Sequence, residues 1–127
     1  MVRIRALMKR NLASVESEQS VSVAATIMRK RRVGSVLVKY EGKIVGIVTE
    51  SDIVRKVVSV HRLPEFTPVQ TIMSSPLISI TEETPIFEAA SIMEEHQTRH
   101  LAVANGHGIV GMVSVRDMLR PVATDEL

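Results

Sequence analysis

Apolar residues recur with helical spacing in two stretches of the chain. The first stretch contains Val21, Ala24, Ala25 and Met28, and the second contains Ile86, Ala89, Ala90 and Met93. Both sets follow the i, i+3, i+4, i+7 pattern that places apolar side chains on one face of an α-helix. We therefore expect one amphipathic helix in each half of the chain.

The start of the second helix has the stronger sequence signal. Thr84 is a residue type favoured at the N-cap, and Pro85 suits the first helical position. In the first half, Gln19 and Ser20 stand at the corresponding positions and form a weaker signal. The sequence thus predicts that Thr84 caps the second helix.

Short β-prone segments surround both helices, and each half contains one before the helix and two after it. They are residues 12–15, 35–38 and 44–48 in the first half, and 77–80, 100–103 and 109–113 in the second. Turn-forming residues separate the last two segments of each half, which predicts two antiparallel hairpins.

A further helix is expected at the end of each half. Its apolar face in the first half comprises Ile53, Val54, Val57 and Val58. In the second half, Pro121 is expected to end this helix soon after Met118 and Leu119, because proline cannot continue it. The predicted fold is α+β, with the order β-α-β-β-α in each half.

The two halves are copies of one unit. A shift of 65 positions, from Met8 to Met73, aligns 48 residues without a gap and gives 14 identities. Most identities are apolar, but Gly46/Gly111 and Asp52/Asp117 are not core pairs. Their presence in both copies suggests two equivalent sites related by a pseudo-twofold axis. The predicted division is 1–62 for the first copy with its connector and 63–127 for the second.

Size and composition limit the kind of protein. Because roughly 60 residues bury too little surface alone, the 127 residues are expected to share one core. No apolar run approaches the roughly 18 residues of a membrane span, and residues 1–10 have no signal-peptide pattern. With no cysteine in the chain, we expect a cytoplasmic protein without membrane association.

Four consecutive cations, residues 29–32, follow the first predicted helix face. Cations are favourable at a helix C-terminus because of the helix dipole. Nucleic-acid binding is the alternative, but we do not expect it, because only 2% of residues are aromatic and available for base stacking.

Residues 46–52 and 111–117 each join a predicted strand to a helix. Thr49 and Ser114 are good N-caps, and Asp52 and Asp117 complete an acidic capping box. Capping does not explain the glycine that begins each segment, because glycine weakens a strand unless something approaches its backbone. A hydroxyl, a helix N-terminus and a carboxylate also suit a nucleotide, so both interpretations remain open.

The duplication and the two Gly-x-x-(Thr/Ser)-x-x-Asp segments resemble a tandem pair of CBS domains, the regulatory modules named after cystathionine β-synthase. The resemblance implies that the copies pack through their sheets as one pseudo-twofold module with two clefts. It implies an adenosine-containing ligand (AMP, ADP, ATP or S-adenosylmethionine) and a homodimer. It also implies a regulatory function without an enzymatic reaction or a required cofactor.

The resemblance assigns ligand-binding roles to particular residues. Ribose and phosphate contacts fall to Thr49, Asp52, Ser114 and Asp117, backbone contacts with adenine to Ala13 and Ile78, and phosphate contacts to Arg99 and His100. Arg116 either adds to that positive charge or is an ordinary exposed residue. Because the first copy has Gly34 and Ser35 in place of Arg99 and His100, the second copy is the better candidate for a charged nucleotide.

Metal binding and catalysis are not expected. His96 and His100 are four residues apart, but His100 is predicted to begin a strand, so the two need not share a helical face. Asp52 and Asp117 lie in different copies without an evident partner base or nucleophile.

Two hypotheses remain. In the first, the chain is a stand-alone module that binds its ligand between the copies and signals to an effector protein. In the second, it is a ligand-free assembly module in which the Thr, Ser and Asp residues serve only as helix caps.

Overall fold

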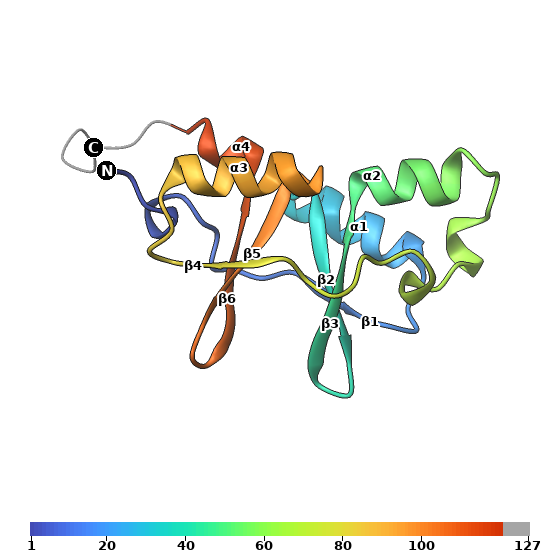
Figure 1. Cartoon of the computed structure of the whole chain (residues 1–127). Helices are drawn as coiled ribbons and strands as arrows, with labels where there is room; N and C mark the ends of the chain where they lie inside the picture. Colours follow the sequence, from blue (N-terminus) through green and yellow to red (C-terminus); the bar gives the residue numbers. More distant parts are fainter. Residues whose placement is uncertain (121–127) are drawn as a thin grey trace. The chain divides into compact units, whose positions relative to one another are not determined.

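The computed structural model of the chain describes residues 1–120 and confirms the predicted α+β fold with two copies of one motif (Figure 1). The first copy consists of β1 (Ser14–Glu16), α1 (Val21–Arg31), β2 (Ser35–Tyr40), β3 (Lys43–Thr49) and α2 (Glu50–Ile53). The second consists of β4 (Ser79–Thr81), α3 (Ile86–His96), β5 (His100–Asn105), β6 (Gly108–Ser114) and α4 (Val115–Met118). Short 3₁₀ turns lie at Ile4–Ala6, Pro64–Phe66 and Val69–Thr71. Within the described part of the chain, every helix is too short or too polar to cross a membrane.

Each copy builds a three-stranded mixed sheet. The middle strand, β2 or β5, pairs in parallel with the strand before the helix and antiparallel with the strand after it. Both predicted hairpins are therefore confirmed. The register shifts at the same place in each hairpin, directly after the pairs Val38↔Gly46 and Val103↔Gly111.

The helix caps differ from the prediction. Thr84 is not the N-cap of α3: the helix begins at Ile86, and Pro85 is its N-cap without a side-chain hydrogen bond. Thr84 is buried, and its Oγ1 accepts a hydrogen bond from Thr81 N at 3.2 Å, which closes the turn after β4. In the first copy, the weaker signal marks a true cap, because Ser20 Oγ accepts a hydrogen bond from Val23 N.

The helix at the end of the first copy also departs from its predicted apolar face. After α2 the chain continues as a π-helix over Val54–Val58, which changes the side chains that share a face. Val57 is buried and Ile53 half-buried, but Val54 and Val58 are exposed. In the second copy α4 ends at Met118, and the predicted stop, Pro121, lies outside the described residues.

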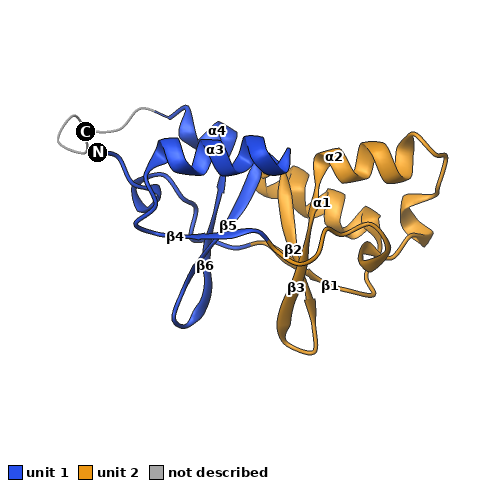
Figure 2. Cartoon of the chain, in the orientation of Figure 1, with its two compact units in different colours: residues 1–12, 78–127 blue, residues 13–77 orange. Residues whose placement is uncertain are grey.

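The chain forms two compact units whose segments are interleaved in the sequence (Figure 2). Unit 2 is Ala13–Leu77 and holds the strands and helices of the first copy. Unit 1 holds those of the second copy and combines Met1–Leu12 with the chain from Ile78 onward. Each copy is thus completed by the segment that precedes the other copy's first strand. We call these segments the leaders, residues 1–12 and 69–77.

Each unit has its own cluster of buried apolar side chains. The cluster of unit 2 contains Val15, Val21, Ala24, Met28, Val36, Val38, Val48, Val57, Val69 and Ile72. The cluster of unit 1 contains Ile4, Met8, Ile80, Ala89, Met93, Leu101, Val103 and Val113. Both clusters include leader residues, because the leader supplies apolar surface that the sheet and helices of one copy lack.

The repeated glycines lie where a leader passes over a sheet. A Cβ atom on Gly46 would lie 2.7 Å from Met73 Sδ and 2.9 Å from Ser74 O. A Cβ on Gly111 would lie 2.9 Å from Lys9 O. The sequence indicated that something must approach these backbones, and in both units the chain itself does so.

Backbone hydrogen bonds hold each leader at this distance. Ser74 and Ile47 exchange two of them, from Ser74 N to Ile47 O at 2.9 Å and from Ile47 N to Ser74 O at 3.1 Å. Lys9 and Met112, each 65 positions removed from this pair, do the same at 2.8 and 2.9 Å. The leader is thus a short antiparallel addition to each sheet.

We predict that Gly46→Ala and Gly111→Ala each lower the free energy of unfolding by about 1–3 kcal/mol, because the new methyl group forces the leader away from the sheet. Gly106→Ala is the matched control, since nothing lies within 4 Å of its added Cβ. Urea unfolding of the three variants measures the difference. Equal stability of all three would show that the leader contact does not require glycine.

Candidate functional site

Both Thr/Ser-x-x-Asp segments form complete capping boxes. In unit 2, Thr49 Oγ1 accepts a hydrogen bond from Asp52 N at 3.1 Å. Asp52 Oδ2 in turn accepts from Thr49 N at 2.9 Å and from Thr49 Oγ1 at 3.1 Å. In unit 1, Ser114 and Asp117 make the same three contacts at 3.2, 2.9 and 3.1 Å. The structural role inferred from the sequence is therefore present in both copies.

The cap uses only one carboxylate oxygen of each aspartate, and the other oxygen has a lysine partner. Lys56 Nζ lies 3.1 Å from Asp52 Oδ1 in unit 2. Lys9 Nζ lies 3.7 Å from Asp117 Oδ1 in unit 1, where the aspartate side chain is only 4% exposed. The aspartates of the two units therefore differ in how closely a cation holds Oδ1.

Neither lysine was identified from the sequence. Lys56 follows Asp52 by four residues, and this helical spacing is a usable signal for an ion pair. In the second copy, Pro121 occupies the corresponding position. Asp117 instead pairs with Lys9, which comes from the leader more than one hundred positions away, and no local pattern could indicate that contact.

The other predicted residues of the second copy lie at the same end of the unit 1 sheet as this box. His100 is half-buried, begins β5 and is the cross-strand partner of Ser114, the last residue of β6. Arg99 immediately precedes His100, and its carbonyl accepts a hydrogen bond from Val115 N at 3.0 Å. Arg116 is exposed in the first turn of α4.

Ala13 and Ile78 occupy matching places directly before β1 and β4. Ala13 O accepts a hydrogen bond from Leu37 N at 2.9 Å, and Ile78 O accepts one from Ala102 N at 3.0 Å. Both carbonyls therefore extend their sheets at the strand ends that lie next to the capping boxes. A carbonyl oxygen has a second lone pair, so these bonds leave one acceptor site.

The two sheet ends differ in charge. Unit 1 places Arg99, His100 and Arg116 around its capping box, whereas Gly34, Ser35 and Ser51 stand at the corresponding positions of unit 2. Anions are attracted to a helix N-terminus surrounded by cations. Chemically, the unit 1 end can accept hydrogen bonds through Asp117 and donate to an anion through its cationic side chains.

The remaining sequence candidates lie elsewhere. His96 ends α3 while His100 begins β5, so they lie on different elements, as predicted. No group of three or more potential metal-ligating His, Asp or Glu side chains occurs within residues 1–120. The basic residues 29–32 are at the C-terminal end of α1, where Arg32 is the C-cap.

Comparison with known proteins identifies the duplicated unit. The family model described as the CBS domain matches the chain twice, at residues 4–59 and 69–124. These two matches differ by the same 65 positions as the internal repeat, and each begins in a leader.

Individual relatives match over most of this chain. The CBS domain-containing protein YhcV of Bacillus subtilis is 29% identical over 93% of this chain and 84% of its own length. The mitochondrial CBS domain-containing protein CBSX3 of Arabidopsis thaliana is 33% identical over 84% of this chain. The chain spans only 54% of the length of CBSX3.

A solved structure has the same fold and contains a ligand. The CBS domain protein PAE2072 from Pyrobaculum aerophilum, complexed with AMP, is 30% identical to this chain, with a TM-score of 0.82. The similarity covers 94% of this chain and 92% of that protein.

We predict that Ser114→Ala lowers the free energy of unfolding by about 0.5–2 kcal/mol in the absence of any ligand, because the N-cap hydrogen bonds are lost. Ser91→Ala is the control: Ser91 is exposed within α3, and its Oγ only donates to Phe87 O one turn earlier. Urea unfolding monitored by circular dichroism measures both. Unchanged stability of Ser114→Ala would contradict the capping role.

Proposed function

We propose that this chain, which belongs to the CBS-domain family and contains the domain twice, is a regulatory module that binds an adenosine-containing ligand and signals to a partner protein. The observation that carries the proposal is that Arg99, His100 and Arg116 belong to the same sheet end as the Ser114–Asp117 box of unit 1, where unit 2 has no arginine. The AMP complex of the similar protein PAE2072 supports the class of ligand.

In this proposal, unit 1 is the principal site. Arg99, His100 and Arg116 hold the phosphate, since charge-assisted hydrogen bonds to an anion are stronger than neutral ones. Asp117 accepts a hydrogen bond from a ribose hydroxyl through Oδ1, because the capping box uses Oδ2. The backbone at Ile78, directly before β4, contacts the adenine.

The lysine contacts favour unit 1 over unit 2. Lys9 lies 3.7 Å from Asp117 Oδ1, which is longer than a hydrogen bond and leaves that oxygen available to a hydroxyl. In unit 2, Lys56 is within hydrogen-bond distance of Asp52 Oδ1, and its Nζ also donates to Ile72 O at 3.0 Å. A ligand at Thr49, Asp52 and Ala13 therefore competes with an internal ion pair and gains no neighbouring arginine.

A signalling role requires that binding change the affinity for a partner. Lys9 offers a physical connection, because it belongs to the leader and pairs with the aspartate that we assign to ribose. In this proposal a bound phosphate attracts Lys9 and so weakens its ion pair with Asp117. We propose that the leader of unit 1 is the first element to respond to the ligand.

Calorimetric titration with AMP, ADP, ATP and S-adenosylmethionine tests the proposal. We expect Arg99→Gln combined with His100→Gln to weaken AMP binding at least about tenfold, because charged hydrogen bonds to the phosphate are lost. Adenosine, which has no phosphate, is the matched ligand, and its affinity should change much less. Asp117→Asn should weaken both ligands, whereas Asp52→Asn should leave the tighter site intact.

The starting protein must be free of copurified nucleotide. Absence of heat with all four ligands would contradict the proposal and favour the assembly module, in which the capping boxes have only a structural role. Equal loss of AMP and adenosine affinity in the Arg99 and His100 variant would contradict the assignment of those side chains to phosphate.

We also propose that the chain forms a homodimer, and one pair of exposed apolar residues supports this. Val54 and Leu119 are equivalent positions of the repeat, 65 residues apart, and are 57% and 79% exposed. Both copies thus retain an apolar side chain at this exposed position. A symmetric self-interface uses the same patch on both protomers, and these two residues are our candidates for it.

We predict that Val54→Ser and Leu119→Ser each weaken self-association, because apolar surface is removed from the interface. Phe87→Ser is the control, since Phe87 is also exposed but its counterpart in the first copy is the polar Ser22. Sedimentation velocity over a concentration series measures association. A protein that is monomeric at all concentrations, or a Phe87 variant that is the most affected, would contradict this surface.

A further inference from the structure

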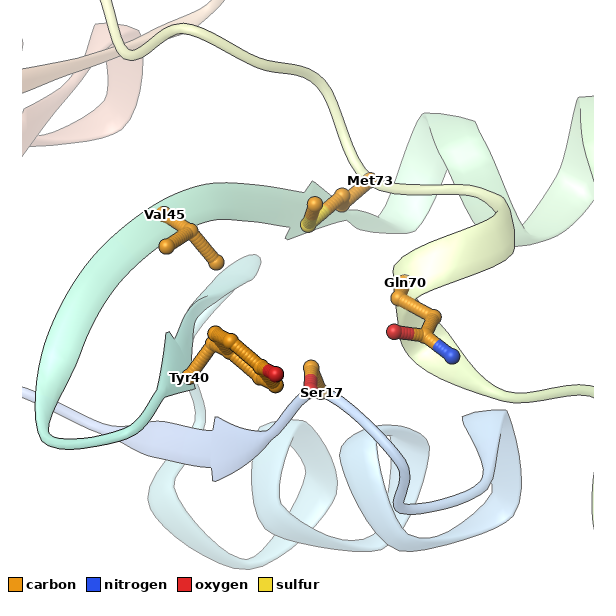
Figure 3. Close-up of a pocket in the computed structure, with 5 residues that line it drawn as sticks. All are labelled: Ser17, Tyr40, Val45, Gln70 and Met73. Atoms are coloured by element: carbon orange, nitrogen blue, oxygen red, sulfur yellow. The ribbon is translucent and has the colours of Figure 1, made fainter.

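We propose that unit 2 contains a second binding site, which takes a small, uncharged, planar aromatic molecule and goes beyond the proposed nucleotide function. The site is a pocket of about 350 Å³ lined by Ser17, Tyr40, Val45, Gln70 and Met73 (Figure 3). Ligand pockets begin at about this size, so it suits a molecule of one or two rings.

The pocket lies at the opposite end of the sheet from Thr49 and Asp52. Tyr40 is the last residue of β2, whereas Thr49 pairs with Ser35 at the first residue of that strand. Ser17 directly follows β1, and Val45 lies near the start of β3. The pocket is therefore distinct from the sheet end that carries the capping box.

Three polar groups on the pocket wall have no partner among residues 1–120. Ser17 is only 4% exposed, and its backbone bonds to Lys39 O and Gln70 N, but its Oγ makes no hydrogen bond within the described chain. The Tyr40 hydroxyl and the Gln70 side-chain amide likewise have none there. Tyr40 is 51% exposed and Gln70 is exposed, so these groups reach solvent, and a ligand group at the pocket can take the place of water on them.

The rest of the wall is apolar and adaptable. Figure 3 shows the Tyr40 ring reaching toward Ser17, while Val45 and Met73 line the other side of the space and Gln70 faces it from the 69–77 leader. Methionine adjusts its shape to aromatic rings and makes favourable sulfur contacts with them. A planar ring between Tyr40 and Met73 therefore has contacts on both faces, with hydrogen-bonding groups at its edge.

The charge of the wall selects against ions. The five lining residues include no Asp, Glu, Lys, Arg or His, so the wall offers a charged ligand no counter-ion. A neutral ring with an amide or hydroxyl substituent matches both the apolar wall and the unpartnered Ser17, Tyr40 and Gln70 groups.

The second copy shows that this wall is not a requirement of the fold. Val45 and Met73 correspond to Val110 and Met8, so the apolar part is retained. The polar part is replaced, with Glu82 in place of Ser17 and Arg5 in place of Gln70. In unit 1 each of these residues forms an ion pair: Glu82 pairs with Arg10 at 3.1 Å, and Arg5 pairs with Glu83.

The matched copies therefore differ in chemistry at this place. Unit 1 closes its polar groups with internal ion pairs, while unit 2 leaves three hydrogen-bonding groups unused around an apolar space. This difference assigns the aromatic site to unit 2 alone.

Tyr40 provides a direct readout, because it is the only tyrosine of a chain without tryptophan. We test three isosteric probes: neutral benzamide, anionic benzoate and cationic benzamidine. Benzamide should change the tyrosine emission saturably and shift the Met73 methyl resonance in spectra of methyl-labelled protein. The two ions should bind at least about fivefold more weakly, because they lose hydration in an uncharged pocket.

Two variants remove the proposed hydrogen bonds without disturbing the core. Ser17→Ala deletes the hydroxyl, and Gln70→Arg places the residue of the second copy at an exposed position. Each should weaken benzamide about two- to tenfold, the range expected for one hydrogen bond. Arg5→Gln, the reciprocal exchange in unit 1, is the matched control and should leave benzamide binding unchanged.

Asp117→Asn separates this site from the nucleotide site: it should weaken AMP and leave benzamide unaffected. The proposal is overturned if benzamide produces no saturable change up to tens of millimolar. It is also overturned if all three probes bind equally, or if Ser17→Ala and Gln70→Arg bind benzamide as tightly as Arg5→Gln does.

Discussion

The passage of a leader backbone across each sheet is the contact on which the other features depend. It needs a residue without a side chain at Gly46 and Gly111, because a Cβ would lie 2.9 Å from the leader's carbonyl oxygen in both units. The same passage brings Lys9 to Asp117 in unit 1 and places Gln70 and Met73 over the sheet of unit 2. The leaders thus supply residues both to the capping box of unit 1 and to the pocket of unit 2.

The parts of the fold that sequence could predict are those specified by neighbouring residues. The buried face of α1 follows from spacing, and the hairpins follow from turns between apolar runs, whereas Ala90 of α3 and Val54 and Val58 after α2 are exposed despite their spacing. Thr84 shows the limit of such local signals, since its hydroxyl closes the preceding turn with Thr81 instead of capping α3. Which side chain caps a helix depends on the path of the chain before that helix. The residue type alone does not determine this path.

For the candidate site, sequence predicted the capping boxes and a strand beginning at His100, and the structure pairs that residue with Ser114. The sequence could not predict Lys9, whose contact with Asp117 depends on the leader joining the other copy's sheet. The sequence indicated that something must approach the backbone at both repeated glycines. Nothing in the local pattern showed whether a ligand or another segment of the chain does so.

Capping and ligand binding are compatible roles for the repeated aspartates, because the two roles use different oxygen atoms. Oδ2 satisfies the backbone and hydroxyl of the N-cap residue in both units, so the carboxylate has a structural reason to be present wherever the motif folds. Oδ1 is then oriented by a cap that does not depend on ligand. The surroundings of Oδ1 differ between the units: Lys56 lies within hydrogen-bond distance of it in unit 2, whereas Lys9 lies 3.7 Å from it in unit 1. Duplication therefore preserves the cap, while the residues around Oδ1 differ from one copy to the other.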